Sequence, residues 1–232
     1  MSLAGGLGIG RRPKERWTVL AGRIANAFGM VLLLVIVTYV LGSLLSYRGW
    51  EGVVLLVATG TLVTVALASA GSAAGRVRIA AGVAAGMVLL GVIAVLTGGS
   101  ALAGIAGLIQ TLLLAVAAVK VLAAVLAERE VGFKTILGAI SVYVILGLLF
   151  TFLYAAIDRL QAGQFFGQPI QTGDFLFFSI TTLTTTGYGN LVPAAQPGRM
   201  LSGLEMLTGQ IFLVTLIAGL VSLWRPGSSR RS

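Results

Sequence analysis

Long apolar stretches dominate this chain, and they restrict its fold more than any other feature. A helix that crosses the hydrocarbon core of a bilayer needs roughly 20 consecutive, mostly apolar residues. Five runs meet that requirement, with limits near 24–46, 52–70, 79–97, 101–127 and 136–157. A sixth run, 200–223, is also long enough but contains Glu205. The runs predict an all-α membrane protein with six transmembrane helices.

The composition supports the membrane class and excludes several kinds of chemistry. Mean hydropathy is +1.02 and only 10% of the residues are charged, too few to cover the surface of a soluble domain. The sequence contains no Cys and no His, which excludes disulfides, thiol catalysis and imidazole acid–base catalysis. We therefore expect no enzyme. The net charge of +9 does not indicate nucleic-acid binding, because the basic residues fall between the apolar runs.

The basic residues predict an orientation for the six helices. Arg48, Arg159 and Arg199 lie on one side, and Lys120 alone lies within a run. The other twelve of the sixteen basic residues fall in the tails 1–23 and 224–232 and in the second and fourth loops. Because cytoplasmic loops are enriched in Lys and Arg, we expect both tails and the linker 128–135 to be cytoplasmic. The protein is then a multi-pass protein of the plasma membrane.

One connection differs from the short loops elsewhere. Residues 158–199 separate the fifth and sixth runs, and they contain the apolar, then Thr-rich stretch 174–186. This stretch is too short to cross a bilayer and is typical of a re-entrant helix. Asp174 favours a helix start there, because acidic side chains stabilise helix N-termini.

The sequence TTLTTTGYGN, residues 181–190, follows this predicted short helix. Non-helical backbone at membrane depth must be buried in protein or line a wet cavity. Gly187 and Gly189 flank Tyr188, and glycine adopts backbone angles that other residues avoid. Such a strand can turn successive carbonyls to one side, and rings of carbonyls can replace the water shell of K⁺. The Thr185 hydroxyl could add an innermost ring.

Residues 136–223 resemble the pore domain of tetrameric potassium channels, with an outer helix, a pore helix (174–186), a T-x-G-Y-G filter (185–189) and an inner helix. The resemblance implies that the carbonyls of Thr185, Thr186, Gly187 and Tyr188, with the Thr185 hydroxyl, coordinate K⁺. Gly189 would shape the mouth of the filter. Gly209, 20 residues further on, stands where many such channels have an inner-helix hinge.

The resemblance also implies an assembly. One filter copy per chain requires four chains to form a ring, so we expect a homotetramer in the lipid bilayer, with K⁺ as the permeant ion and no cofactor. Three residues depart from the family pattern. Thr186 replaces the usual Val or Ile, Asn190 replaces the usual Asp at the filter mouth, and Thr181 stands where one bacterial member has Glu. The side-chain bracing of this filter is therefore expected to differ, while the carbonyl ladder is retained.

Residues 24–127 occupy the place of a voltage sensor, since the layout is similar to the voltage-gated-like superfamily. Steep sensing uses about 3–4 gating charges per subunit, whereas the fourth run carries only Lys120. We expect weak or absent voltage gating, with Lys120 extending towards the inner interface. Because nine residues follow the last run, we also expect no cytoplasmic ligand-binding domain.

Two questions stay open at this stage. Glu205 either supports the filter from a buried position or faces the outer solution, solvated or paired with Arg199. The leading function is a potassium-selective channel. The alternatives are a subunit of a potassium transporter, which usually carries several degenerate filter copies, and a membrane scaffold with a non-conducting loop.

Overall fold

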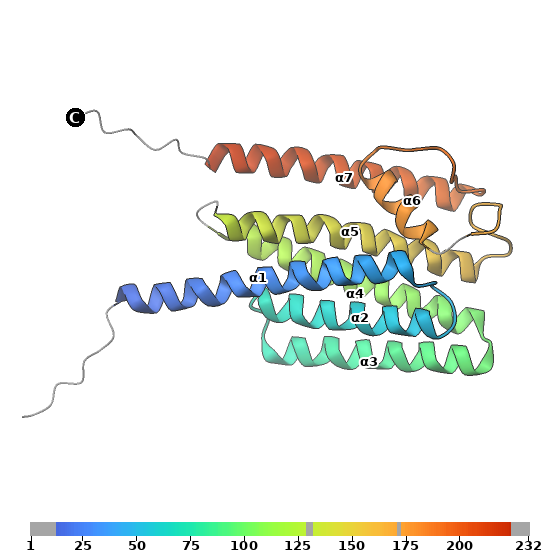
Figure 1. The fold of residues 1–232 in the computed structure, drawn as a ribbon, viewed down its shortest axis with the longest axis horizontal. Coiled ribbons are helices and arrows are strands. Elements are labelled where there is room, and N and C mark those ends of the chain that lie inside the picture. The colour runs from blue at the N-terminus through green and yellow to red at the C-terminus, as the bar shows by residue number, and fades with distance from the viewer. Residues whose placement is uncertain (1–12, 129–131, 171–172, 224–232) are drawn as a thin grey trace, which may run out of the picture.

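The computed structural model describes residues 13–128, 132–170 and 173–223, which form seven helices and no strand (Figure 1). The helices are α1 (Pro13–Leu44), α2 (Gly49–Ser69), α3 (Ala74–Thr97), α4 (Ser100–Leu126), α5 (Phe133–Leu160), α6 (Asp174–Leu183) and α7 (Gln196–Leu223). The six long helices run roughly along one direction, and the short α6 is inclined between α5 and α7 (Figure 1). The all-helical prediction is confirmed.

Five of these helices are long and apolar enough to cross a membrane: α1 over Ala27–Leu44, α2, α3, α4 and α5 over Lys134–Leu160. The chain is thus a multi-pass membrane protein. α7 has 28 residues but is not among the helices of the described residues that are long and apolar enough. A sixth transmembrane helix therefore remains a prediction.

The helices pack as two connected groups. α4 lies along α5, α2 contacts α1, α3 and α4, and α1 also contacts α5. On the other side of α5, α6 contacts both α5 and α7. Small residues allow the close approaches: a Cβ at Gly107 of α4 would lie 3.0 Å from the Ala156 Cβ of α5. Close contact between small residues is the usual basis of helix association in lipid.

Helix limits differ from the predicted ones at two places that matter. α1 begins at Pro13 rather than at 24, and proline is well suited to a first helical position because its φ is already fixed. α6 ends at Leu183 rather than at 186. It ends there because Thr185 has a φ of +56°, a left-handed conformation that a helix cannot contain.

Candidate functional site

The end of α6 turns directly into a glycine-containing, non-helical segment, residues 185–189, which belongs to no β-sheet among the described residues and is here called the strand. The N–H of Thr185 donates to the Thr182 carbonyl at 2.9 Å. The N–H groups of Thr186 and Gly187 both donate to the Thr181 carbonyl, at 2.8 and 3.1 Å. Three consecutive amides of the strand therefore point back to the helix and satisfy its last free carbonyls.

Backbone conformation alternates along this strand. Thr185, Gly187 and Gly189 have φ values of +56°, +54° and +81°, while Thr186 and Tyr188 between them do not have positive φ. A β-branched residue such as Thr rarely adopts positive φ, so Thr185 is a conformational outlier of the kind found at functional sites. Alternation of left-handed and other residues turns successive peptide groups the same way, with N–H groups on one side and carbonyls on the other.

The carbonyls of this strand have no protein partner. Within the described part of the chain, none of the five carbonyls from Thr185 to Gly189 accepts a hydrogen bond, and all five residues are exposed in the single chain. The amides of Thr185, Thr186 and Gly187 are bonded towards α6, and the five carbonyls are left available. This arrangement can present a row of oxygen atoms to a cation.

A buried carboxylate ties three helices together behind the strand. Glu205 of α7 is fully buried. Its Oε2 accepts a hydrogen bond from the Tyr154 hydroxyl of α5 at 2.6 Å, and its Oε1 accepts one from the Ser179 hydroxyl of α6 at 2.5 Å. Among the described residues Glu205 forms no ion pair with Arg199, whose Nε donates instead to the Pro193 carbonyl at 3.0 Å.

Gly209 lies at a close contact between α7 and the end of α6. A Cβ at this position would lie 2.1 Å from the Leu183 carbonyl oxygen, far inside contact distance. The same carbonyl accepts a hydrogen bond from the Tyr143 hydroxyl at 3.4 Å, and the Tyr143 ring stacks on Phe212. α7 continues as one helix through Gly209. Gly209 is therefore required for packing, whether or not it also acts as a hinge.

The structure adds Gln210, which the sequence does not single out. Its Nε2 donates to the Thr185 hydroxyl oxygen at 2.8 Å, and that hydroxyl donates to the Thr184 carbonyl at 2.7 Å. Gln210 thus contacts the side chain expected to form the innermost ring. The sequence marks Gln210 only as a polar residue next to Gly209 in an apolar run. Its contact with Thr185 depends on how α7 is aligned with the strand, which the structure shows.

The remaining predicted residues lie around the strand. Thr181 acts through its backbone carbonyl, described above, while its hydroxyl donates to the Phe178 carbonyl at 3.0 Å. The Thr186 and Thr184 hydroxyls are 2.9 Å apart and form a hydrogen bond.

The Asn190 carbonyl accepts a hydrogen bond from Gln168 at 3.3 Å. The Tyr188 ring stacks on Phe177 at 5.6 Å between centroids and is 70% exposed in the single chain.

The region that contains α6 and the strand is also the part of the chain that matches a known protein family. Residues 138–225 match the model of a family described as "Ion channel", and this match covers most of α5 together with α6, the strand and α7. The match supports an ion-channel family for the chain, and it suggests a protein that is not an enzyme. No curated protein and no solved structure gives a significant match. The fold is that of a multi-pass membrane protein, and its residues 138–225 are similar to an ion-channel family.

Proposed function

We propose that this protein is a potassium-selective channel that conducts K⁺ passively across the plasma membrane. Residues 185–189 form the selectivity filter, with the carbonyls of Thr185, Thr186, Gly187 and Tyr188 as ligands. The observation that carries the proposal is the alternation of positive φ at Thr185, Gly187 and Gly189. The first three amides of the strand are bonded to α6, and its carbonyls accept no hydrogen bond from the described residues. Oxygen rings of this kind replace the hydration shell of K⁺.

We propose a homotetramer, because one strand supplies only one side of each ring. Two features of the single chain support assembly. The strand and the Tyr188 ring are exposed, although such groups are covered in a working filter. α7 also carries an exposed apolar stripe that repeats at alternating intervals of four and three residues, the spacing of helix–helix contacts. Its members are Met200, Leu204, Leu207, Ile211 and Val214.

Orientation follows from the charges in the loops. With both tails on the cytoplasmic side, α7 crosses the membrane as the sixth helix and residues 161–173 lie outside. The filter then opens to the outer solution near Asn190, and Thr185 and Gln210 lie at its inner end. The C-terminal end of α6 points at this inner end, and helix C-termini favour cations because of the helix dipole.

Flux measurements on purified protein in liposomes test the function. We expect K⁺ uptake that exceeds Na⁺ uptake and is blocked by Ba²⁺, a divalent cation close to K⁺ in size. Replacing Gly187 by Ala strains the strand, because its φ is +54°, and the K⁺ preference should fall. Gly203→Ala is the matched control, since a Cβ there meets nothing within 4 Å. Absence of any flux in the wild-type protein would contradict the channel and leave a transporter subunit or a scaffold.

A further inference from the structure

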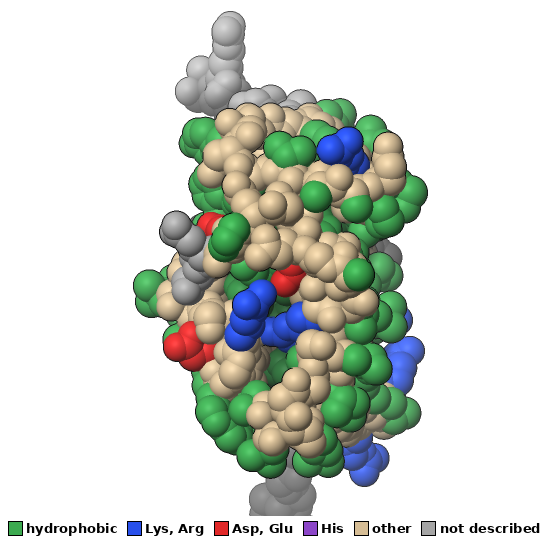
Figure 2. Space-filling model, turned by 90° about the vertical axis from the view of Figure 1, so that its right-hand side faces the viewer, with side chains coloured by type: hydrophobic (Ala, Val, Ile, Leu, Met, Phe, Trp, Pro, Cys, Tyr) green, Lys and Arg blue, Asp and Glu red, His purple; other side chains and the backbone are tan. Residues whose placement is uncertain are grey.

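A cavity lies at the end of the bundle formed by the first five helices. It has a volume of about 520 Å³ and is lined by the α1–α2 connection, the start of α2, the end of α3, the start of α4 and the end of α5. Figure 2 views the molecule from this end. Basic side chains lie in a hollow near the centre of the face, with acidic side chains close by.

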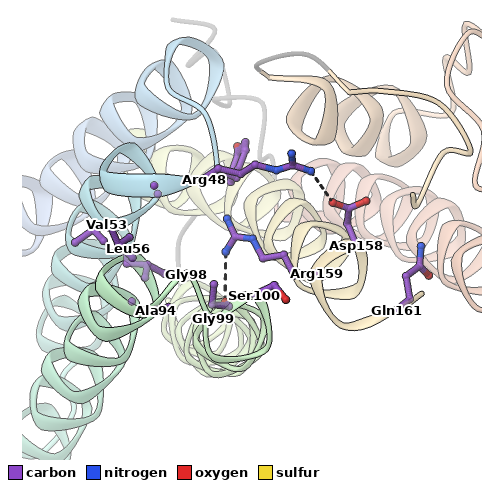
Figure 3. Close-up of a pocket in the computed structure, with 16 residues that line it drawn as sticks. Arg48, Val53, Leu56, Ala94, Gly98, Gly99, Ser100, Asp158, Arg159 and Gln161 are labelled. Atoms are coloured by element: carbon purple, nitrogen blue, oxygen red, sulfur yellow. Dashed lines mark hydrogen bonds and ion pairs between the residues drawn. The ribbon is translucent and has the colours of Figure 1, made fainter. Parts of the chain in front are cut away.

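The cavity carries more positive than negative charge. Arg48, Arg159 and Asp158 are its charged lining residues (Figure 3). The Asp158 side chain is only 7% exposed, and both of its oxygens have partners: Oδ1 accepts from the Phe165 amide at 2.9 Å, and Oδ2 pairs with Arg48 at 3.5 Å. The Asp158 carboxylate thus accepts a hydrogen bond from a loop amide and forms an ion pair with Arg48, but not with Arg159.

Among the described residues, Arg159 has no carboxylate as an ion-pair partner. In the described part of the chain it forms no ion pair, and its one hydrogen bond goes to the Ala103 carbonyl at 3.3 Å. Its side chain is half-buried. A partly buried charge is costly unless it is paired, and a guanidinium has five N–H donors. Most of the Arg159 donors are therefore available to a ligand in the cavity.

The walls suit a bulky oxyanion with an apolar extension. Next to Arg159 stands Gly52, where a Cβ would lie 3.8 Å from the Arg159 Nη2, so no side chain covers the guanidinium on that side. Gly98 and Gly99, which also have no side chain to fill the space, line the cavity too (Figure 3). Val53, Leu56 and Val95 add an apolar part to the lining, which also contains the polar side chains of Ser100 and Gln161.

We propose that this cavity binds a phosphate-bearing anion through Arg159 and Arg48. Guanidinium groups match the geometry of phosphate oxygens and bind them by paired, charge-assisted hydrogen bonds. The phosphate belongs either to the headgroup of an anionic phospholipid, with its chains along the apolar wall, or to a soluble phosphate. The proposal depends on the fold of the bundle and not on the proposed channel function.

Native mass spectrometry of the detergent-solubilised protein tests the site. The probes are phosphatidylglycerol and, for comparison, zwitterionic phosphatidylcholine. We expect Arg159→Gln to weaken phosphatidylglycerol binding about tenfold, because it removes a charge-assisted interaction. Arg48→Gln should weaken it as well, and this side chain is 70% exposed, so the variant is expected to fold even if Arg159→Gln does not. Arg78→Gln, an equal change of charge at an exposed position of α3, is the matched control.

Competition distinguishes the two sources of the phosphate. If inorganic phosphate displaces phosphatidylglycerol from the wild-type protein and not from Arg159→Gln, the site takes a soluble phosphate. If it does not displace the lipid, and lipid binding still depends on both arginines, the site takes a lipid headgroup. Equal phosphatidylglycerol binding by the wild type, both arginine variants and the control, with no arginine-dependent effect of phosphate, would overturn the proposal.

Discussion

Thr185 has an unusual backbone conformation, and its hydroxyl forms two hydrogen bonds. It adopts positive φ, its hydroxyl donates to the Thr184 carbonyl, and the same hydroxyl oxygen accepts from Gln210. A hydroxyl oxygen has two acceptor sites, so Gln210 occupies one of the two that a cation could use. The N–H dipole of Gln210 also places partial positive charge beside the innermost ring. In the proposed channel, Gln210 therefore weakens cation binding at that ring.

Gln210→Leu should tighten block by Ba²⁺. The substitution frees an acceptor site on Thr185 and removes a positive dipole, and a typical net hydrogen-bond energy corresponds to a change of about 2- to 10-fold. The measurement is Ba²⁺ inhibition of K⁺ flux in liposomes. Thr208→Val is the control, because its hydroxyl bonds only to Leu204 in its own helix. An unchanged Ba²⁺ inhibition constant in Gln210→Leu would show that this contact does not act on the ion.

Tyr154 is the second residue for which the structure makes a sharp prediction. Tyr154→Phe leaves the buried Glu205 Oε2 without its donor, and an unsatisfied buried polar group costs about 1–3 kcal/mol. We expect a clear fall in thermal stability of the detergent-solubilised protein. Tyr143→Phe is a matched control on the same helix, since its hydrogen bond to Leu183 is longer, at 3.4 Å, and half-exposed. Equal stability losses in both variants would count against a special role for the Glu205 network.

At the scale of the elements, the contact between α6 and α7 fixes the height of the strand. A Cβ at position 209 would collide with the Leu183 carbonyl at 2.1 Å, and backbone on both sides leaves little room to adjust. Gly209→Ala should therefore destabilise the protein by at least about 1–3 kcal/mol, although alanine is the better helix former. Gly203→Ala, on the same helix with open space around it, should be neutral or stabilising. Thermal unfolding compares the two, and equal melting temperatures would contradict the packing role.

The sequence predicts the elements far better than their contacts. Apolar runs and the motif at 185–189 are local signals, so the long helices and the strand can be located from the order of residues alone. The predicted end of α6 is too late because the residue types of the three Thr carry no stop signal, whereas the helix ends through the positive φ of Thr185, which Thr rarely adopts. The Gln210–Thr185 bond joins residues 25 positions apart, and the cavity of Arg159 joins five segments. Neither contact leaves a periodic or spacing pattern in the sequence.

At the scale of the whole molecule, the charges inside the apolar helices decide how the membrane potential can act. α4 packs closely along α5, and Lys120 is its one basic residue. One charge that crosses the full field gains about 2.3 kcal/mol per 100 mV, and four subunits gain roughly four times that amount as an upper limit. Sensors of steep channels move about 3–4 charges per subunit. In the proposed channel we therefore expect α4 to contribute little to opening by voltage.

Lys120→Gln should accordingly leave the dependence of conductance on voltage almost unchanged. Lys120 is half-buried near the end of α4, where its chain can extend to the interface, so its removal costs a surface interaction and no sensing charge. The measurement is the conductance of reconstituted protein over a series of voltages, with Gln110→Leu as a control in the same helix. Gln110 is buried with both side-chain polar atoms unpartnered among the described residues, so that control should not lose stability. A steep sigmoidal curve in the wild type that becomes flat in Lys120→Gln would mean that this single charge moves through the field and that α4 shifts against α5.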